Sequence, residues 1–114
     1  MLVGIGRTTG VMNDDGTTQQ LQYKTPFDVR GSTLRMTEFG FSSGLPAGSD
    51  VLILSIGGDR SSQIIVATNH GSTRYGNLNP GETVIYDAQG KSVLLGKEKL
   101  TVKCAGQDIE GLDS

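Results

Sequence analysis

The residues of this chain that could do chemistry are few and far apart. Residues 4–10, GIGRTTG, superficially have the glycine spacing of a phosphate-binding loop, but no Gly-Lys-Ser/Thr and no helix pattern follow. Asp14 and Asp15 could form a carboxylate pair for acid–base catalysis. They fall in the run Asn-Asp-Asp-Gly, which is typical of a hairpin turn. We therefore predict that residues 4–10 form a glycine-containing strand and that Asp14 and Asp15 lie in a solvated turn.

His70 and Cys104 are the single histidine and the single cysteine. No Ser-His-Asp or Cys-His order can be built around His70, even with Glu82 or Asp87 as partner. The chain also lacks zinc-ligand spacing, and one thiol cannot form an intrachain disulfide. We predict no catalytic residue, no metal site and no cofactor, so the chain is not an enzyme. We interpret Cys104 as a small buried strand residue.

Three aromatic residues, Tyr23, Phe39 and Phe41, could form a stacking platform for single-stranded nucleic acid. Such platforms work together with clustered Lys and Arg that neutralise phosphates. Here the net charge is −2, and the acidic and basic residues are interspersed. The pattern favours core or subunit packing for these rings, and we predict no nucleic-acid partner.

Composition predicts one small domain with limited means of building its own core. The chain has 114 residues, 35% of them apolar, with 17 glycines and no tryptophan. Part of the burial is therefore expected to come from other copies of the chain. No apolar run approaches the ~20 residues that span a bilayer. The N-terminus lacks the features of a signal peptide, so we expect synthesis in a cytoplasm.

The elements that position these residues are strands, because β-branched residues and turn dipeptides dominate and no helical periodicity persists. Five strands are predicted before residue 69, at 2–12, 17–27, 32–38, 51–56 and 62–68. Five short strands fit an OB-type Greek-key barrel, although an SH3-like barrel has similar spacing. The polar residues 69–81 are predicted to be a linker loop.

Three shorter strands are predicted after the linker, at 82–86, 91–95 and 100–104. In the last of them Leu100, Val102 and Cys104 face one way. A ribbon this narrow is marginal alone. The simplest cover for its apolar face is the same ribbon from symmetry-related copies.

Several short motifs follow one another in a specific order. They are FGF at 39–41, LPAG at 45–48, an apolar strand at 51–56, GGDR at 57–60, a second apolar strand at 64–67, LNPGE at 78–82 and YDAQG at 86–90. In this order they resemble the central spike proteins of Mu-type contractile phage tails, the baseplate assembly protein V family. The resemblance covers about residues 37–95.

The resemblance implies an all-β protein with an OB-type barrel at 1–68, a linker at 69–81 and a trimeric spike or shaft at 82–114. The shaft would be an intertwined β-prism or β-helix. The implied function is that of a structural virion protein, the homotrimeric central spike or hub of the baseplate, which helps to pierce the host envelope. Implied partners are hub and tail-tube proteins, a separate spike-tip protein, and transiently the host outer membrane.

The resemblance also suggests which residues make contacts. The turn Gly57, Gly58, Asp59 and Arg60 is a candidate for docking a partner, with a turn-local ion pair as the alternative. A trimer interface is expected at Val84, Tyr86, Val93, Leu95, Leu100, Val102 and Cys104.

The chain departs from the family in one respect. Spikes of this family often hold an iron ion at the apex through His-x-His from three chains, whereas His70 lies before the ribbon. We therefore predict no metal site here. The main rival interpretation is an OB-fold module that binds single-stranded nucleic acid or oligosaccharide. A monomer in solution with salt-sensitive oligonucleotide binding would favour it.

Overall fold

The computed structural model describes residues 2–26, 29–55, 62–104 and 107–110. Within these ranges the chain forms strands and loops with no helix, and so no helix long and apolar enough to cross a membrane. Its contacts divide it into two compact units, Met1–Gly71 and Ser72–Ser114. The all-β prediction is confirmed.

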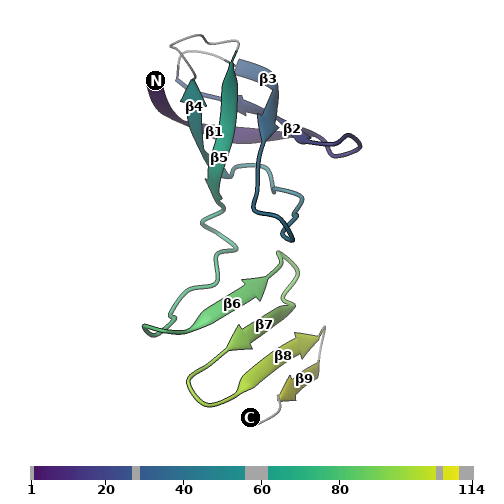
Figure 1. Ribbon diagram of the computed structural model, residues 1–114, viewed down its shortest axis with the longest axis vertical. Coiled ribbons are helices and arrows are strands. Elements are labelled where there is room, and N and C mark those ends of the chain that lie inside the picture. The colour runs from purple at the N-terminus through teal and green to yellow at the C-terminus, as the bar shows by residue number, and fades with distance from the viewer. Residues whose placement is uncertain (1, 27–28, 56–61, 105–106, 111–114) are drawn as a thin grey trace. The chain divides into compact units, whose positions relative to one another are not determined.

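The first unit is a closed barrel of five strands in the order β1-β2-β3-β5-β4 (Figure 1). These strands are β1 (Leu2–Asn13), β2 (Gln19–Lys24), β3 (Val29–Arg35), β4 (Asp50–Ser55) and β5 (Gln63–Asn69). β1 pairs with β4 to close the barrel, and all pairings are antiparallel except the short parallel contact of β3 with β5. This is the expected OB-type barrel.

The long strand β1 bends in the middle, and it pairs with a different strand in each half. Its first half pairs with β4 from Leu2 to Arg7, and its second half pairs with β2 as far as Asn13. The register shifts between Thr8 and Met12, and Gly10 lies there with a left-handed φ of 99°. A bulge with glycine in this conformation lets a strand bend, so that its two halves can pair with different neighbours in a barrel.

The barrel core is small. Its buried apolar side chains among the described residues are Leu21, Tyr23, Val51, Ile53 and Ile65, with Leu45 packed against them. The predicted alternation of Leu21 and Tyr23 with polar neighbours is confirmed. In β5 the inward residue is Ile65, whereas Ile64 is half-buried and Val66 is exposed, at a register shift between β4 and β5.

Buried hydroxyls fasten the loop between β3 and β4 to the barrel. The Thr8 hydroxyl donates to the Pro46 carbonyl at 3.0 Å and accepts from the Ser49 amide at 3.0 Å. The Ser49 hydroxyl donates to the same Pro46 carbonyl at 2.7 Å. Because both hydroxyls are buried and satisfied, they hold the Pro/Gly-rich segment against the end of the barrel.

Most predicted strands are confirmed within one or two residues, but the third is displaced. It was expected at 32–38 and lies at Val29–Arg35. Gly31 and Ser32, whose φ is +56°, look like turn residues in the sequence and are inside the strand. They lie where the pairing with β2 shifts register, between Leu21 and Tyr23. In an irregular strand of this kind, the alternation of apolar and polar residues is not visible in the sequence.

The second unit is a four-stranded antiparallel sheet in the order β6-β7-β8-β9. Its strands are β6 (Thr83–Tyr86), β7 (Ser92–Leu95), β8 (Leu100–Cys104) and β9 (Gln107–Glu110). The first three match the prediction. The fourth was not predicted, because residues 107–110 contain one apolar residue and show no strand period.

The close approach of β1 to β2 gives a testable prediction at Gly6. A β-carbon on Gly6 would lie 2.5 Å from Cδ2 of the buried Tyr23 ring and 3.2 Å from the Lys24 carbonyl oxygen. Gly6→Ala should therefore destabilise the barrel by about 1–3 kcal/mol, the usual cost of overpacking. Thermal unfolding followed by circular dichroism measures this.

Gly4→Ala is the matched control, since a β-carbon there meets nothing within 4 Å. Equal melting temperatures for the two variants would show that Tyr23 does not pack against β1 in this way.

Candidate functional site

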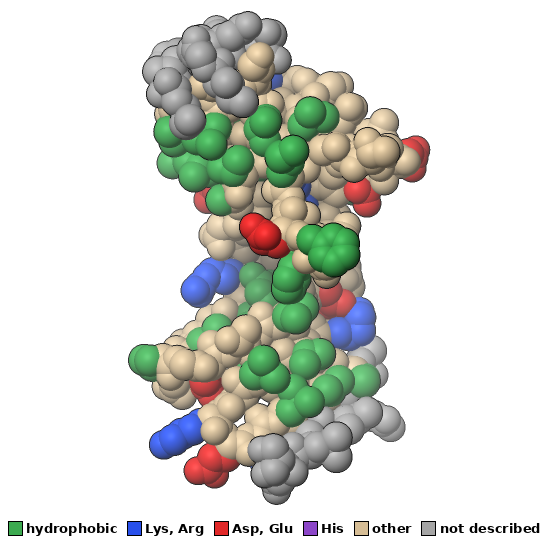
Figure 2. All heavy atoms as spheres, viewed as in Figure 1, with side chains coloured by type: hydrophobic (Ala, Val, Ile, Leu, Met, Phe, Trp, Pro, Cys, Tyr) green, Lys and Arg blue, Asp and Glu red, His purple; other side chains and the backbone are tan. Residues whose placement is uncertain are grey.

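The outside of the barrel carries a continuous apolar surface. In β4, Val51 and Ile53 point into the core, so Leu52 and Leu54 point outward. Cross-strand neighbours share a face, and Ile5 lies opposite Leu52. The outer apolar surface consists of Val3, Ile5, Leu34, Leu52, Leu54, Ile64 and Val66. Figure 2 shows hydrophobic side chains gathered over β4 and β5.

None of the described residues of its own unit covers this surface. Val3 is 63% exposed and Ile5 is 70% exposed. Contiguous exposed apolar patches on small proteins mark interaction sites. Since β4, the middle strand of this surface, is paired on both sides, contacts over it are made by side chains and not by an added strand.

The sheet of the second unit has one open apolar face. Ile85 lies opposite Val93, and Leu95 lies opposite Leu100. Ile85 is 57% exposed and Leu95 is 51% exposed. We call this the open ribbon face, and its residues are Ile85, Val93, Leu95, Leu100, Val102 and Cys104. Cys104 is exposed, so the expectation that it is buried was wrong: among the described residues of its own unit, none covers it.

The register divides the predicted trimer-interface residues between two faces. Val84 and Tyr86 lie on the side opposite to the open ribbon face, where Val84 pairs with Leu94. That side is partly covered by its own unit, since the Tyr86 ring lies 6.1 Å from the Tyr75 ring, centroid to centroid. Ile85, which sequence reasoning missed, is on the open ribbon face.

The turn between β6 and β7 explains this division. Tyr86 pairs with Ser92, so five residues, 87–91, separate the two strands. An odd number of turn residues places odd-numbered residues opposite odd-numbered ones, which puts Ile85 with Val93. The YDAQG motif alone did not reveal the length of the turn.

Asp87 holds this turn together. Its Oδ1 accepts hydrogen bonds from the Gln89 and Lys91 amides, both at 2.9 Å, and its Oδ2 lies 2.7 Å from Lys91 Nζ. The hydrogen bond from the Lys91 side chain, followed by the amide bonds, lowers the pKa of Asp87 from 3.8 to about 2. The carboxylate form is therefore favoured by the folded turn.

We expect the carboxyl resonance of Asp87 to titrate near pH 2 in the folded protein. Because the folded pKa is depressed, the stabilisation by Asp87 is complete above about pH 4 and is lost as the pH falls toward 2. A carbon-13 NMR titration measures the midpoint. Lys91→Met should raise it, and a wild-type midpoint near 4 would contradict the turn geometry.

The other residues considered for chemistry do not come together in one site within the described part of the chain. Asp14 Oδ1 accepts a hydrogen bond from the side-chain amide of Gln19, and Asn13 Oδ1 accepts one from the backbone amide of Asp15. Such bonds are expected in a solvated hairpin turn. Tyr23 is buried in the core, so it cannot form a stacking platform with Phe39 and Phe41. Within the described ranges, no group of three or more His, Cys, Asp or Glu could hold a metal ion.

The comparisons with known proteins place residues 8–72 in a family. These residues match the family model described as "Bacteriophage Mu Gp45, N-terminal". The chain belongs to the bacteriophage Mu Gp45 family. It is a structural protein of the phage baseplate, located in the virion tail, and it works with other baseplate proteins. No curated protein and no solved structure matches the chain.

The match to the Mu Gp45 family covers nearly the whole barrel unit and ends where that unit ends, at about Gly71. Five of the seven residues of the outer apolar surface therefore lie in the part of the chain that matches the family model, whereas Val3 and Ile5 precede it. The docking candidates Gly57, Gly58, Asp59 and Arg60 fall within the match but lie outside the described residues.

One further charged side chain of the barrel lies in a surface hollow. Arg35, at the end of β3, lies in a polar hollow of about 480 Å³. Its Nη1 donates to Gln19 Oε1 and to the Ser43 carbonyl, and its Nη2 donates to Ser43 Oγ, at 2.9–3.0 Å. Desolvation by burial lowers the pKa of Arg35, and the Asp14 carboxylate opposes that shift. Sequence reasoning did not single out Arg35, since an isolated Arg in a strand carries no motif.

Proposed function

We propose that this Mu Gp45 family member is the homotrimeric central spike or hub of a contractile-tail baseplate and helps to pierce the host envelope. The observation that supports this most is the open ribbon face. A four-stranded sheet with Ile85 and Leu95 more than half exposed needs a cover, and symmetry-related copies of the same sheet supply it.

In this proposal the two parts have different roles. The barrel, residues 1–68, docks on hub and tail-tube proteins, and residues 69–81 link it to the shaft. Residues 82–114 form the trimeric shaft, a β-prism or β-helix, and a separate protein supplies the tip. The mechanism is mechanical: sheath contraction supplies force, and strands closed in a trimer do not expose edges that could peel.

No side chain is assigned a catalytic role or a cofactor. We propose synthesis and assembly in the host cytoplasm, and transient contact with the host outer membrane on injection. The rival, an OB-fold module for nucleic acid or oligosaccharide, would instead be a monomer, and its binding of an oligonucleotide would weaken with salt.

The test is genetic. A phage that lacks this gene should give no infectious particles, and the wild-type protein supplied in trans should restore them, with the protein seen on the tail axis by electron microscopy. Normal particles without the protein, or its location away from the axis, would contradict the proposal.

A second prediction concerns the turn at residues 57–60, proposed to dock a baseplate partner. Arg60→Ala should leave the isolated trimer folded but reduce its incorporation into particles, because an arginine can bind a carboxylate with two parallel hydrogen bonds. Complementation titre with a parallel sedimentation run measures both. If the mutant trimer dissociates, the turn stabilises the trimer itself and does not dock a partner. If the titre is normal, the turn does not dock a baseplate partner.

A further inference from the structure

The polar hollow that Arg35 lines is built from two separate segments of the barrel unit. The hairpin of β1 and β2 contributes residues 14 and 16–19, and the end of β3 with the loop after it contributes residues 35–37, 42 and 43. Its volume of about 480 Å³ falls within the usual range for small-molecule sites. Neither the open ribbon face nor the proposed docking turn includes this hollow.

The side-chain amide of Gln19 lies between a cation and an anion in the polar hollow. Its Oε1 accepts from Arg35 Nη1 at 2.9 Å, and its Nε2 donates to Asp14 Oδ1 at 3.1 Å and to the Ser43 carbonyl at 2.8 Å. No direct ion pair joins Asp14 and Arg35 in the described structure. The amide therefore positions the guanidinium and the carboxylate without letting them neutralise each other.

Hydrogen-bonding groups of both kinds remain unused around the polar hollow. Arg35 makes its three hydrogen bonds through Nη1 and Nη2, which leaves one hydrogen on Nε and one on Nη2 without a described acceptor. Asp14 Oδ2 has no described donor. Thr17, Thr18 and Ser42 also line the hollow, and their hydroxyls have no described hydrogen bond. A ligand that fits here must both accept and donate hydrogen bonds.

The charges around the polar hollow do not suit a simple ion. An anion at Arg35 would be repelled by Asp14 and by Glu38, which lines a second hollow beside Phe41 that Arg35 also borders. A cation at Asp14 would meet the guanidinium. A neutral hydroxyl can accept from the guanidinium or donate to the carboxylate, so it carries neither of these costs.

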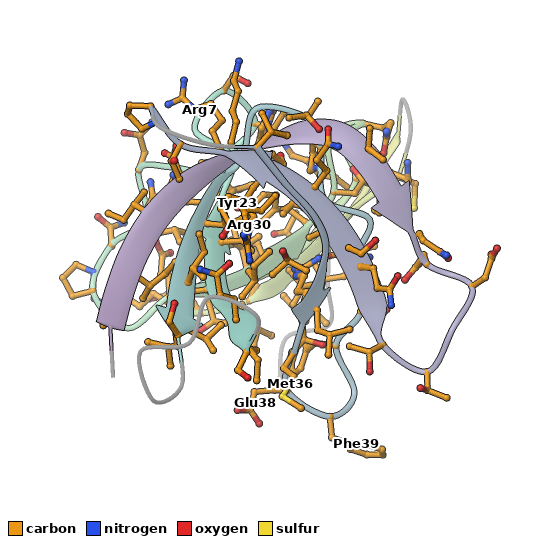
Figure 3. All side chains as sticks on the ribbon, turned by 90° about the horizontal axis from the view of Figure 1, so that it is seen from above. Arg7, Tyr23, Arg30, Met36, Glu38 and Phe39 are labelled. Carbon is orange, nitrogen blue, oxygen red and sulfur yellow. The ribbon has the colours of Figure 1, made fainter. Side chains whose placement is uncertain are left out.

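Met36 adds an apolar wall to the polar hollow. It is 61% exposed, and Figure 3 shows it at the outer edge of the barrel, away from the buried Tyr23. An unbranched thioether side chain adapts to the shape of what it contacts. The CH groups of a sugar ring are apolar, whereas its hydroxyls both donate and accept, so a sugar ring matches an apolar wall beside polar groups.

From this arrangement we infer that the polar hollow binds a saccharide. One ring hydroxyl accepts from Arg35, a neighbouring hydroxyl donates to Asp14, and the CH groups of the ring lie against Met36. The threonine and serine hydroxyls bind the remaining ring oxygens. The inference goes beyond the proposed spike function and does not depend on the trimer, since all the lining residues belong to one chain.

Two-dimensional NMR of the full chain, labelled with nitrogen-15, tests the binding, because the Nε–H group of Arg35 gives its own resonance. The probes are the methyl glycosides of glucose, galactose and mannose. Cyclohexanol, which has a six-membered ring and a single hydroxyl, is the control ligand. We expect at least one glycoside to shift Arg35 Nε–H and the amides of residues 14–19, 42 and 43 in a saturable way below about 100 mM, which includes weak millimolar binding.

Cyclohexanol should leave these resonances unchanged. The absence of a saturable shift with all three glycosides, or shifts confined to other residues, overturns the inference. Glycine, which carries both charges, and inorganic phosphate are tested in the same way. If either of them binds at these residues more tightly than every glycoside, the hollow is a site for a charged ligand and the inference is also overturned.

Asp14→Asn tests the role of the carboxylate. An asparagine can still accept from Gln19, but it offers no charge to a ligand hydroxyl. The affinity for the bound glycoside should fall about fivefold or more, because hydrogen bonds to charged groups are roughly twice as strong as neutral ones. Asp15→Asn makes the same change at a residue that does not line the hollow, and it should keep the wild-type affinity. An unchanged affinity in Asp14→Asn, or an equal loss in both variants, overturns the assignment.

Discussion

Ile53→Ala is expected to lower the free energy of unfolding of the barrel by about 2–5 kcal/mol, the usual cost of truncating a buried isoleucine. Ile53 is 3% exposed and lies between Gly4 on β1 and Ile65 on β5. Among the described residues, few side chains share the core with it, so rearrangement of these neighbours would not fill the cavity. For a domain of this size the melting temperature should fall by at least ~8 °C.

The control for this experiment is Val11→Ala, since Val11 is a β-branched residue on β1 that is 60% exposed. It should melt close to the wild type. An unchanged melting curve for Ile53→Ala would show that β4 has another register and that the core lies elsewhere.

Ile85→Asp is expected to abolish trimer formation while leaving the barrel folded. On the proposed assembly, the open ribbon face is buried between copies, and three carboxylates would be brought together there without partners. Burial of unpaired charge costs far more than one apolar contact supplies. Sedimentation equilibrium should show loss of the trimer, and the barrel should still melt cooperatively.

Gln89→Asp adds the same charge in the exposed turn between β6 and β7 and should leave the trimer intact. If Ile85→Asp also remains a trimer, the open ribbon face is not the interface, and the opposite side with Tyr86 becomes the candidate.

The sequence predicted the barrel well because each of its strands has a local signal. β2 alternates apolar and polar residues, and β4 is nearly continuous in apolar residues between Asp50 and Ser55. The local sequence patterns did not reveal the register shifts. In β5 the inward residue is Ile65, because the pairing slips between Leu52 and Ile53 and places Val66 outside.

The candidate surfaces were less predictable because they depend on register and on three-dimensional neighbours. Ile85 and Val84 are equally apolar, and only the five-residue turn held by Asp87 decides which of them lies with Val93. The hollow beside Phe41 joins the end of β3 to β5, which are parallel neighbours far apart in the sequence. No local pattern reports such a pairing.

The native mass of the full chain tests the central claim most directly. Light scattering coupled to size exclusion, at micromolar concentration, should return three times the chain mass of 12.0 kDa, because the open ribbon face then finds cover in other copies. A stable species with the mass of one chain would contradict the account.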